Sequence, residues 1–158
     1  MTNYKAYTLS EATKKMEHYC AYQDRCHKEV LTKLQEMRMI PEAIDQIMVH
    51  LIKENYLNEE RFAQSFARGK FNIKKWGKKR IELELKRRGI SHFLIGIALK
   101  EINTQTYQET LDTLILKKLA TLKGETNIQK KKKKLADYLL YRGWESHLVY
   151  DKINEFIK

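Results

Sequence analysis

A pattern of apolar residues at helical spacing recurs three times along this chain and constrains its fold more than any other feature. In the middle copy the apolar positions are Ile81, Leu85, Ile90, Ile95, Leu99 and Ile102. A shift of 51 positions towards the N-terminus aligns them with Val30, Leu34, Met39, Ile44, Met48 and Leu51. A shift of 54 positions towards the C-terminus gives a third copy, with Leu135, Leu139, Arg142, Gly143, Val149, Ile153 and Phe156. Units of this length are marginally stable alone, so neighbouring units should stack and share apolar surface.

Residues that favour turns are scarce, which directs each repeat towards helices. The 158 residues include one proline and six glycines, too few for the corners of an all-β sandwich or barrel. Leucine, lysine and glutamate, by contrast, favour helix. The predicted fold is all-α, with three tandem three-helix repeats that form an elongated, curved array. The repeats are expected at residues 8–57, 58–103 and 104–158.

The middle repeat carries signals for three helices. The first begins after Asn58 as its N-cap, the second ends at Gly89, and the third follows Ser91 as its N-cap. The inner stripe of the first helix is expected to comprise Phe62, Phe66, Gly69 and Ile73. Gly89 and its counterpart Gly143 should close their helices with positive φ. The segment 123–129, KGETNIQ, is expected to be a mobile loop.

Motifs for metal binding, catalysis and membrane insertion are missing from the sequence. Cys20 and Cys26 are six positions apart, which does not fit CxxC chemistry, and no second pair completes a zinc set. The five histidines form no HExxH motif, and there is no P-loop. No apolar run approaches ~18 residues, and the first residues do not resemble a signal peptide. We expect a cytoplasmic protein without metal or cofactor, whose two thiols stay reduced.

Positive charge is concentrated in the middle and last thirds of the chain. The net charge is +11, yet residues 1–58 carry eight basic and eight acidic side chains, whereas residues 59–102 carry twelve and five. Residues 68–80, RGKFNIKKWGKKR, contain seven basic residues and no acidic one. Such an uneven distribution indicates that this region faces a negatively charged partner.

The candidate contact surface follows from this segment and from the basic residues after it. The predicted site residues are Arg68, Lys70, Lys74, Lys75, Trp76, Lys78, Lys79, Arg80, Lys86, Arg87 and Arg88. An auxiliary basic patch is predicted at Lys130, Lys131, Lys132, Lys133 and Lys134. Stacked repeats would align such residues along a row of phosphates, a contact that carries no sequence information. Phe71 and Trp76 either stack on unpaired bases or pack between helices, and their spacing favours packing.

Residues 58–91 resemble the middle repeat of the RecX regulators of the bacterial recombinase RecA. The shared elements begin with an acidic turn (Glu59-Glu60), the triplet Arg61-Phe62-Ala63, a basic stretch (Lys74-Lys75) and a glycine (Gly77). They continue with an Ile-x-x-Glu-Leu helix (Ile81, Glu84 and Leu85) that ends in Arg88-Gly89-Ile90. Residues 22–34 resemble the first repeat more loosely, with Cys26 where the family has serine and Val30 where it has leucine. The third repeat keeps the helix spacing and the Arg-Gly end.

This resemblance implies a non-catalytic regulator. Such a protein binds RecA in its filament on single-stranded DNA, blocks filament growth, and reduces strand exchange and coprotease activity. The expected partners are therefore the RecA filament and single-stranded DNA, the latter through its backbone without sequence specificity. A monomer with no membrane contact is expected, acting in DNA repair, recombination and the SOS response.

Two other function classes were weighed from the residues alone. A helix-turn-helix transcription regulator would also be small and basic, but no recognition helix with base-reading residues stands out. A sequence-nonspecific basic nucleic-acid-binding helical protein is the alternative that the residues leave open. A nuclease would need converging carboxylates for its metal. Glu82 and Glu84 instead point about 200° apart on their helix and have basic neighbours suited to ordinary ion pairs.

Overall fold

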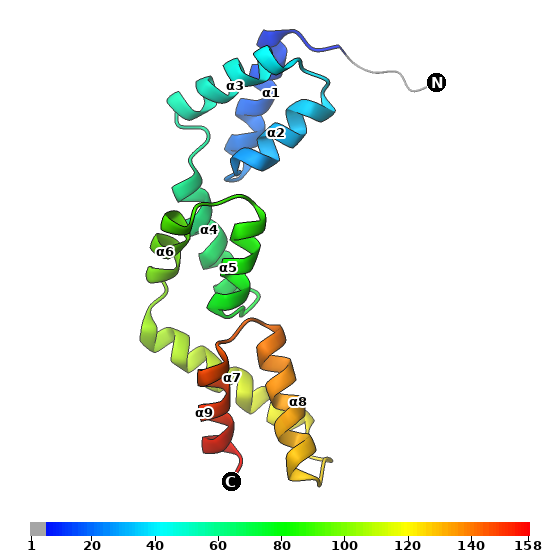
Figure 1. Cartoon of the computed structure of the whole chain (residues 1–158), viewed down its shortest axis with the longest axis vertical. Coiled ribbons are helices and arrows are strands. Elements are labelled where there is room, and N and C mark those ends of the chain that lie inside the picture. Colours follow the sequence, from blue (N-terminus) through cyan, green and yellow to red (C-terminus); the bar gives the residue numbers. More distant parts are fainter. Residues whose placement is uncertain (1–5) are drawn as a thin grey trace, which may run out of the picture.

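The computed structural model describes residues 6–158, and these residues form nine α-helices and no β-strand. The bounds are α1 Leu9–Tyr22, α2 His27–Glu36, α3 Pro41–Lys53, α4 Glu59–Asn72, α5 Lys78–Arg87, α6 His92–Lys100, α7 Thr104–Thr121, α8 Ile128–Tyr141 and α9 Ser146–Phe156. Figure 1 shows them as three groups of three, stacked into an elongated, gently curved array. The predicted all-α repeat fold is confirmed. The repeat boundaries at 8–57, 58–103 and 104–158 stay a prediction.

The helix ends predicted in the middle repeat are present. Asn58 accepts a hydrogen bond from the backbone N–H of Arg61 at 2.9 Å, and Ser91 accepts one from that of Leu94 at 3.3 Å. Gly89 and Gly143 have φ of 76° and 90°, as predicted. These caps fix where the chain turns between helices.

The second helix of each group ends in the same way. The residue two positions past its last helical residue has positive φ: Arg38 in the first group (60°), Gly89 in the second and Gly143 in the third. The following N–H then bonds back to a carbonyl five residues earlier, from Met39 to Leu34 at 3.2 Å and equivalently in the other groups, as in a Schellman motif. In the first group an arginine therefore occupies the position that glycine holds in the other two.

The apolar side chains form two separate cores. One lies within α1–α3 and the residues that follow α3, and it includes Met16, Leu34 and Leu51. The other is continuous through α4–α9 and includes Leu85 and Leu135. The expectation that neighbouring units share apolar surface therefore holds for the middle and last groups.

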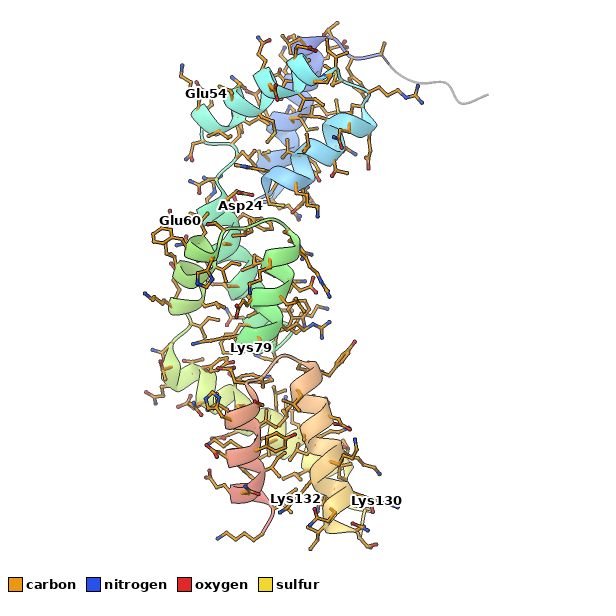
Figure 2. The ribbon with its side chains drawn as sticks, viewed as in Figure 1. Asp24, Glu54, Glu60, Lys79, Lys130 and Lys132 are labelled. Carbon is orange, nitrogen blue, oxygen red and sulfur yellow. The ribbon has the colours of Figure 1, made fainter. Side chains whose placement is uncertain are left out.

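The first and middle groups meet largely through polar contacts. Asp24 accepts hydrogen bonds from Arg61 Nε at 2.7 Å and from Ser65 Oγ at 3.0 Å, and Figure 2 shows it at this boundary. Glu59 accepts one from the backbone N–H of His27 at 3.0 Å. Cys26 is the apolar exception, because its buried side chain belongs to the core of the middle and last groups.

The predicted inner stripe of α4 is wrong in part. Phe62 is buried, but Ile73 is 77% exposed, and Ala63, Ala67 and Phe71 complete the buried face. The reason is that α4 ends at Asn72, so Ile73 is a cap residue that points away from the core.

The segment expected to be a mobile loop carries defined contacts. Glu125 pairs with Lys134 Nζ at 3.0 Å, and Asn127 caps α8 by accepting from the N–H of Lys130 at 3.1 Å. Helix α8 begins at Ile128, so the last two residues of 123–129 are helical. The mobility of this segment stays a prediction.

Candidate nucleic-acid interface

The basic segment 68–80 lies where the middle group of helices meets the last group. It comprises the end of α4, the turn through residues 73–77 and the first turn of α5, and Figure 2 labels Lys79 at this boundary. The turn is docked on the connection between α8 and α9. The N–H of Gly77 donates to the carbonyl of Arg142 at 2.9 Å, and the N–H of Lys79 donates to that of Gly143 at 2.9 Å. The backbone that carries the basic residues is thus fixed by contacts with a distant part of the chain.

Two glycines make this close approach possible. A Cβ at Gly77 would lie 2.4 Å from the carbonyl oxygen of Gly143, and a Cβ at Gly143 would lie 2.2 Å from the Cβ of Arg80. Both distances are far below van der Waals contact. Any other residue at either position would force the two backbones apart.

Buried aromatic residues support the same junction from the last group. Trp144 is buried, stacks on Tyr107 with ring centroids 4.4 Å apart, and donates from Nε1 to the carbonyl of Lys75 at 3.2 Å. Lys75 has φ of 59°. The phenol of Tyr107 accepts from the N–H of Lys78 at 2.8 Å and donates to Glu145. Burial, and then the hydrogen bond to Glu145, raise the pKa of Tyr107, which keeps it a neutral donor.

Sequence reasoning missed this support. Tyr107, Trp144 and Glu145 carry no local motif, although Trp144 follows an Arg-Gly pair as Ile90 does in the middle repeat. That shared position was the one available signal that Trp144 belongs to a helix end rather than to a free surface.

Of the two aromatics in the basic segment, Phe71 is buried, as the packing interpretation predicted. Trp76 is half-buried and meets Phe66 edge-on, with centroids 6.3 Å apart. Lys70 Nζ and the Arg80 guanidinium lie over its ring at 5.0 Å and 4.2 Å from the centroid. Trp76 thus holds two of the cations of the segment in place.

Ion pairing divides the predicted site residues into two sets. Four of them pair with carboxylates of their own unit: Arg68 with Glu101, Lys86 with Glu82, and both Arg87 and Arg88 with Glu84, at 2.7–3.2 Å. The hydrogen bond from Arg88 is the main reason that the pKa of Glu84 lies below its usual value. Among the described residues the other six cations form no ion pair; they are Lys70, Lys74, Lys75, Lys78, Lys79 and Arg80. We call these six the unpaired junction cations.

The predicted auxiliary patch lies elsewhere. Residues 130–134 belong to the first two turns of α8, and Figure 2 shows Lys130 and Lys132 at the far end of the last group. Lys133 pairs with Asp137 at 2.7 Å, which raises the pKa of Lys133, and Lys134 pairs with Glu125. At 1.5 Å per residue, about 10 to 16 Å of helix lies between these lysines and the end of α8 at Tyr141, next to the junction.

No group of three or more histidine, cysteine, aspartate or glutamate side chains within residues 6–158 is placed to hold a metal ion. Glu82 and Glu84 form the ion pairs expected of them. Cys20 and Cys26 are buried thiols, and burial raises the pKa of each to about 11. None of the helices in this part of the chain is long and apolar enough to cross a membrane.

Comparisons with known proteins point to one family. The family models for the RecX second and third three-helix domains match residues 58–99 and 105–153. A protein of Oceanobacillus iheyensis called Regulatory protein RecX is 30% identical over 148 residues, which are 94% of this chain and 52% of that protein. A protein of the same name from Chlorobium phaeobacteroides is 28% identical over 135 residues, which are 85% of this chain and 86% of that protein. The chain thus spans about half the length of the first relative.

Solved structures give the same fold. The crystal structure of RecX from Lactobacillus salivarius superposes with a TM-score of 0.81 at 28% identity, covering 94% of this chain and 96% of that one. A second crystal structure of a regulatory protein RecX gives 0.82 at 24% identity, covering 93% of this chain and 71% of that one. The second likeness concerns the fold alone.

Proposed function

Because the chain belongs to the RecX family of regulatory proteins, we propose that it binds RecA and the filament that RecA forms on single-stranded DNA. In this proposal it inhibits filament growth and recombinase activity without catalysing a reaction. It acts in the cytoplasm, as a monomer, in DNA repair, recombination and the SOS response.

The observation that carries the proposal is the set of unpaired junction cations. Six cations stand within eleven consecutive residues and have no carboxylate partner among the described residues. Lys74, Lys75 and Lys79 are exposed. A negatively charged partner would therefore gain their full attraction, because no internal ion pair has to be broken first.

The rigidity of the junction adds to this argument. The backbone hydrogen bonds from Gly77 and Lys79, together with the Trp144 indole, hold the turn against the last group. Ordering a loop on binding costs conformational entropy, and a turn that is already ordered avoids that cost. This supports a surface that exists before its partner arrives.

The shape of the molecule suits a helical filament. An elongated, curved array has a long side that can follow the groove of such a filament (Figure 1). Along that groove the junction would meet DNA phosphates and acidic protein surface, and both attract the same cations. Arg68, Lys86, Arg87 and Arg88 would contribute less than predicted from the sequence, because their own carboxylates already neutralise them.

The test replaces four of the exposed or half-exposed lysines of the junction with glutamine. The variant carries Lys74→Gln, Lys75→Gln, Lys78→Gln and Lys79→Gln. Inhibition of RecA strand exchange and of its DNA-dependent ATPase should fall sharply. The salt dependence of DNA binding should flatten, since each lost phosphate contact removes roughly 0.7 from the slope on a single strand. Folding should be retained, because exposed charges contribute little to stability.

A matched control removes the same charge elsewhere. Four exposed lysines outside the junction serve for this: Lys14, Lys53, Lys100 and Lys123, each replaced with glutamine. This control should inhibit RecA nearly as well as the parent. If both quadruple variants lose inhibition equally, net charge alone explains the effect. If the junction variant inhibits as well as the parent at physiological salt, the basic segment is only a solvated surface and the proposal is wrong.

Free RecA separates the two partners that the junction could contact. Binding of the junction variant to RecA is measured in the absence of DNA, by pull-down with purified proteins. Retained binding would assign the lysines to phosphates, and lost binding would assign them to an acidic face of RecA.

A further inference from the structure

A groove lies beside the junction, on the side where α8 ends. It has a volume of about 700 Å³ and is lined by Tyr138, Tyr141, Arg80, Lys118, Lys134 and Arg142, with Asp137 as its one acidic residue. The lining residues come from α5, α7 and α8 and from Arg142, the residue directly after α8. We call it the tyrosine groove. Its lining includes one of the junction cations, Arg80, and one lysine of the patch at the start of α8, Lys134.

The groove carries a strong positive charge. Among the described residues Arg80, Lys118 and Arg142 form no ion pair. Asp137 is already paired with Lys133, at 2.7 Å. Three of the four cations therefore lack a carboxylate partner, and the one carboxylate that lines the groove is engaged elsewhere.

The cations are positioned by the aromatic rings and by backbone carbonyls. The Arg142 guanidinium lies 4.7 Å from the centroid of Tyr138 and donates to the carbonyl of Lys74 at 2.9 Å. Lys118 Nζ lies over the same ring at 5.0 Å. The Arg80 guanidinium lies over Tyr141 at 5.0 Å. These contacts hold the cations over the two rings without neutralising their charge.

Tyr141 is the unusual member of the set. Its side chain is 77% exposed, although it is the last residue of α8 and is followed closely by the tightly packed Gly143 and Trp144. Its ring supports no core, in contrast to the buried Tyr107. An exposed aromatic face among cations that lack carboxylates matches the two chemical parts of an unpaired nucleotide, a planar base and a phosphate.

We propose that the tyrosine groove binds a segment of single-stranded nucleic acid, with one base stacked on Tyr141 and the adjoining phosphates held by Arg80, Lys118 and Arg142. Duplex DNA does not fit this description, because its bases are already stacked and paired. Binding has no sequence preference, since every base offers a face to stack and no base edge is read. The groove thus adds base stacking to the phosphate contacts of the junction.

This inference extends the proposed contact with single-stranded DNA, but it needs no RecA. An experiment with the chain and an oligonucleotide alone therefore tests it separately. If the groove binds as proposed while RecA inhibition is absent, only the proposed function fails. If RecA is inhibited while the groove variants bind DNA normally, only the groove proposal fails.

The experiment measures fluorescence anisotropy of two labelled oligomers with the full chain. One is an oligothymidine of roughly 10 nucleotides, within the site sizes of known single-strand binders. The other is an abasic oligomer of the same length, with the same phosphates and no bases. The variants are Tyr141→Leu, which removes the aromatic face, and Tyr141→Phe, which keeps it. The hydrogen bond between Arg80 and Tyr141 uses the backbone carbonyl, so both variants retain it.

Tyr141→Leu should weaken oligothymidine binding roughly fivefold or more, the lower end of the range for base stacking on an aromatic side chain. Tyr141→Phe should bind within about twofold of the parent. The abasic oligomer should bind Tyr141→Leu and the parent equally. Tyr22→Leu is the matched control, because Tyr22 is 83% exposed but lies in the first group, and it should change neither affinity.

Three results would overturn the proposal. Unchanged oligothymidine binding by Tyr141→Leu would show that no base stacks there. An equal loss for both oligomers would mean that the substitution disturbs the cations rather than stacking. In a third result, polyglutamate displaces the oligothymidine equally well from the parent and from Tyr141→Leu, and the parent binds the oligothymidine no more tightly than the abasic oligomer. The groove would then be a site for acidic protein segments.

Discussion

One added methyl group at Gly143 should destabilise the protein far more than one added at Gly89. Both glycines end the second helix of their group with positive φ, 90° and 76°. Around Gly89 a Cβ would meet no atom within 4 Å, whereas at Gly143 it would lie 2.2 Å from the Cβ of Arg80 and 2.4 Å from its backbone nitrogen. The two sites share the backbone requirement and differ in the contact with the neighbouring group.

The expected magnitudes follow from these differences. For Gly89→Ala the left-handed conformation alone should cost about 1 kcal/mol. Gly143→Ala adds the separation of two backbones by roughly 1 Å, which weakens the hydrogen bonds from Gly77 and Lys79. With a net contribution of about 1 kcal/mol from each bond, the total becomes about 3 kcal/mol. In a chain of this size these values correspond to melting shifts of roughly 3 °C and 9 °C.

Gly77→Ala separates the effect of the backbone clash from the effect of positive φ. Gly77 has φ of −76° and ψ of 166°, which alanine adopts without strain. Its cost of about 2 kcal/mol would therefore come only from the clash with the backbone of Gly143 and Trp144. Because either Cβ separates the same pair of backbones, the double variant Gly77→Ala/Gly143→Ala should lose less stability than the sum of the two.

Urea unfolding followed by tryptophan fluorescence provides the assay. Both tryptophans of the chain, Trp76 and Trp144, lie at this junction, so their emission reports on it directly. A Gly143→Ala variant within about 0.5 kcal/mol of Gly89→Ala would refute the close approach of the two backbones. An additive double variant would refute their coupling.

Three further predictions concern the rest of the molecule. Small-angle scattering should give a radius of gyration clearly above the ~15 Å of a compact domain of this length, and a value near 15 Å would contradict the elongated array. Cys20 and Cys26 should resist a thiol reagent at pH 8 until the protein unfolds. Burial raises the pKa of both thiols from 9.0 to about 11, so their contribution to the free energy of unfolding is complete below pH 9 and should be lost as the pH rises through 11. Replacing both cysteines with serine would abolish this pH-dependent loss. A double-mutant cycle on Asp24 and Arg61 should give a coupling free energy of about 0.5–1 kcal/mol. Amide hydrogen exchange in α1–α3 should also become faster in Asp24→Asn. A coupling free energy of zero would mean that this ion pair does not stabilise the contact between the first and middle groups.

The helices and their ends were determined by the sequence itself. The apolar period, the N-caps at Asn58 and Ser91, and the glycines at 89 and 143 act within about five residues of their own position. Such short-range interactions are the same wherever the helix is placed in space, so the sequence predicted them and the repeat fold that they build. Ile73 shows the limit of this reasoning, because extrapolating the period past Asn72 assigned to the core a side chain that is 77% exposed.

The candidate surface was decided only by the tertiary structure. The sequence placed the basic residues in one segment and indicated the local ion pairs of Glu82 and Glu84, but it did not predict that Arg68 pairs with Glu101, 33 positions away. It also did not predict the docking of the turn at Gly77 onto Gly143, or the contact of Arg142 with Lys74, 68 positions away. Contacts at such separations depend on how whole helices pack, and packing is set by the summed apolar surface of many residues rather than by a local signal. Charge, the apolar period and the turns can therefore be predicted from the sequence, whereas charge partners that are distant in the sequence are determined only by the folded structure.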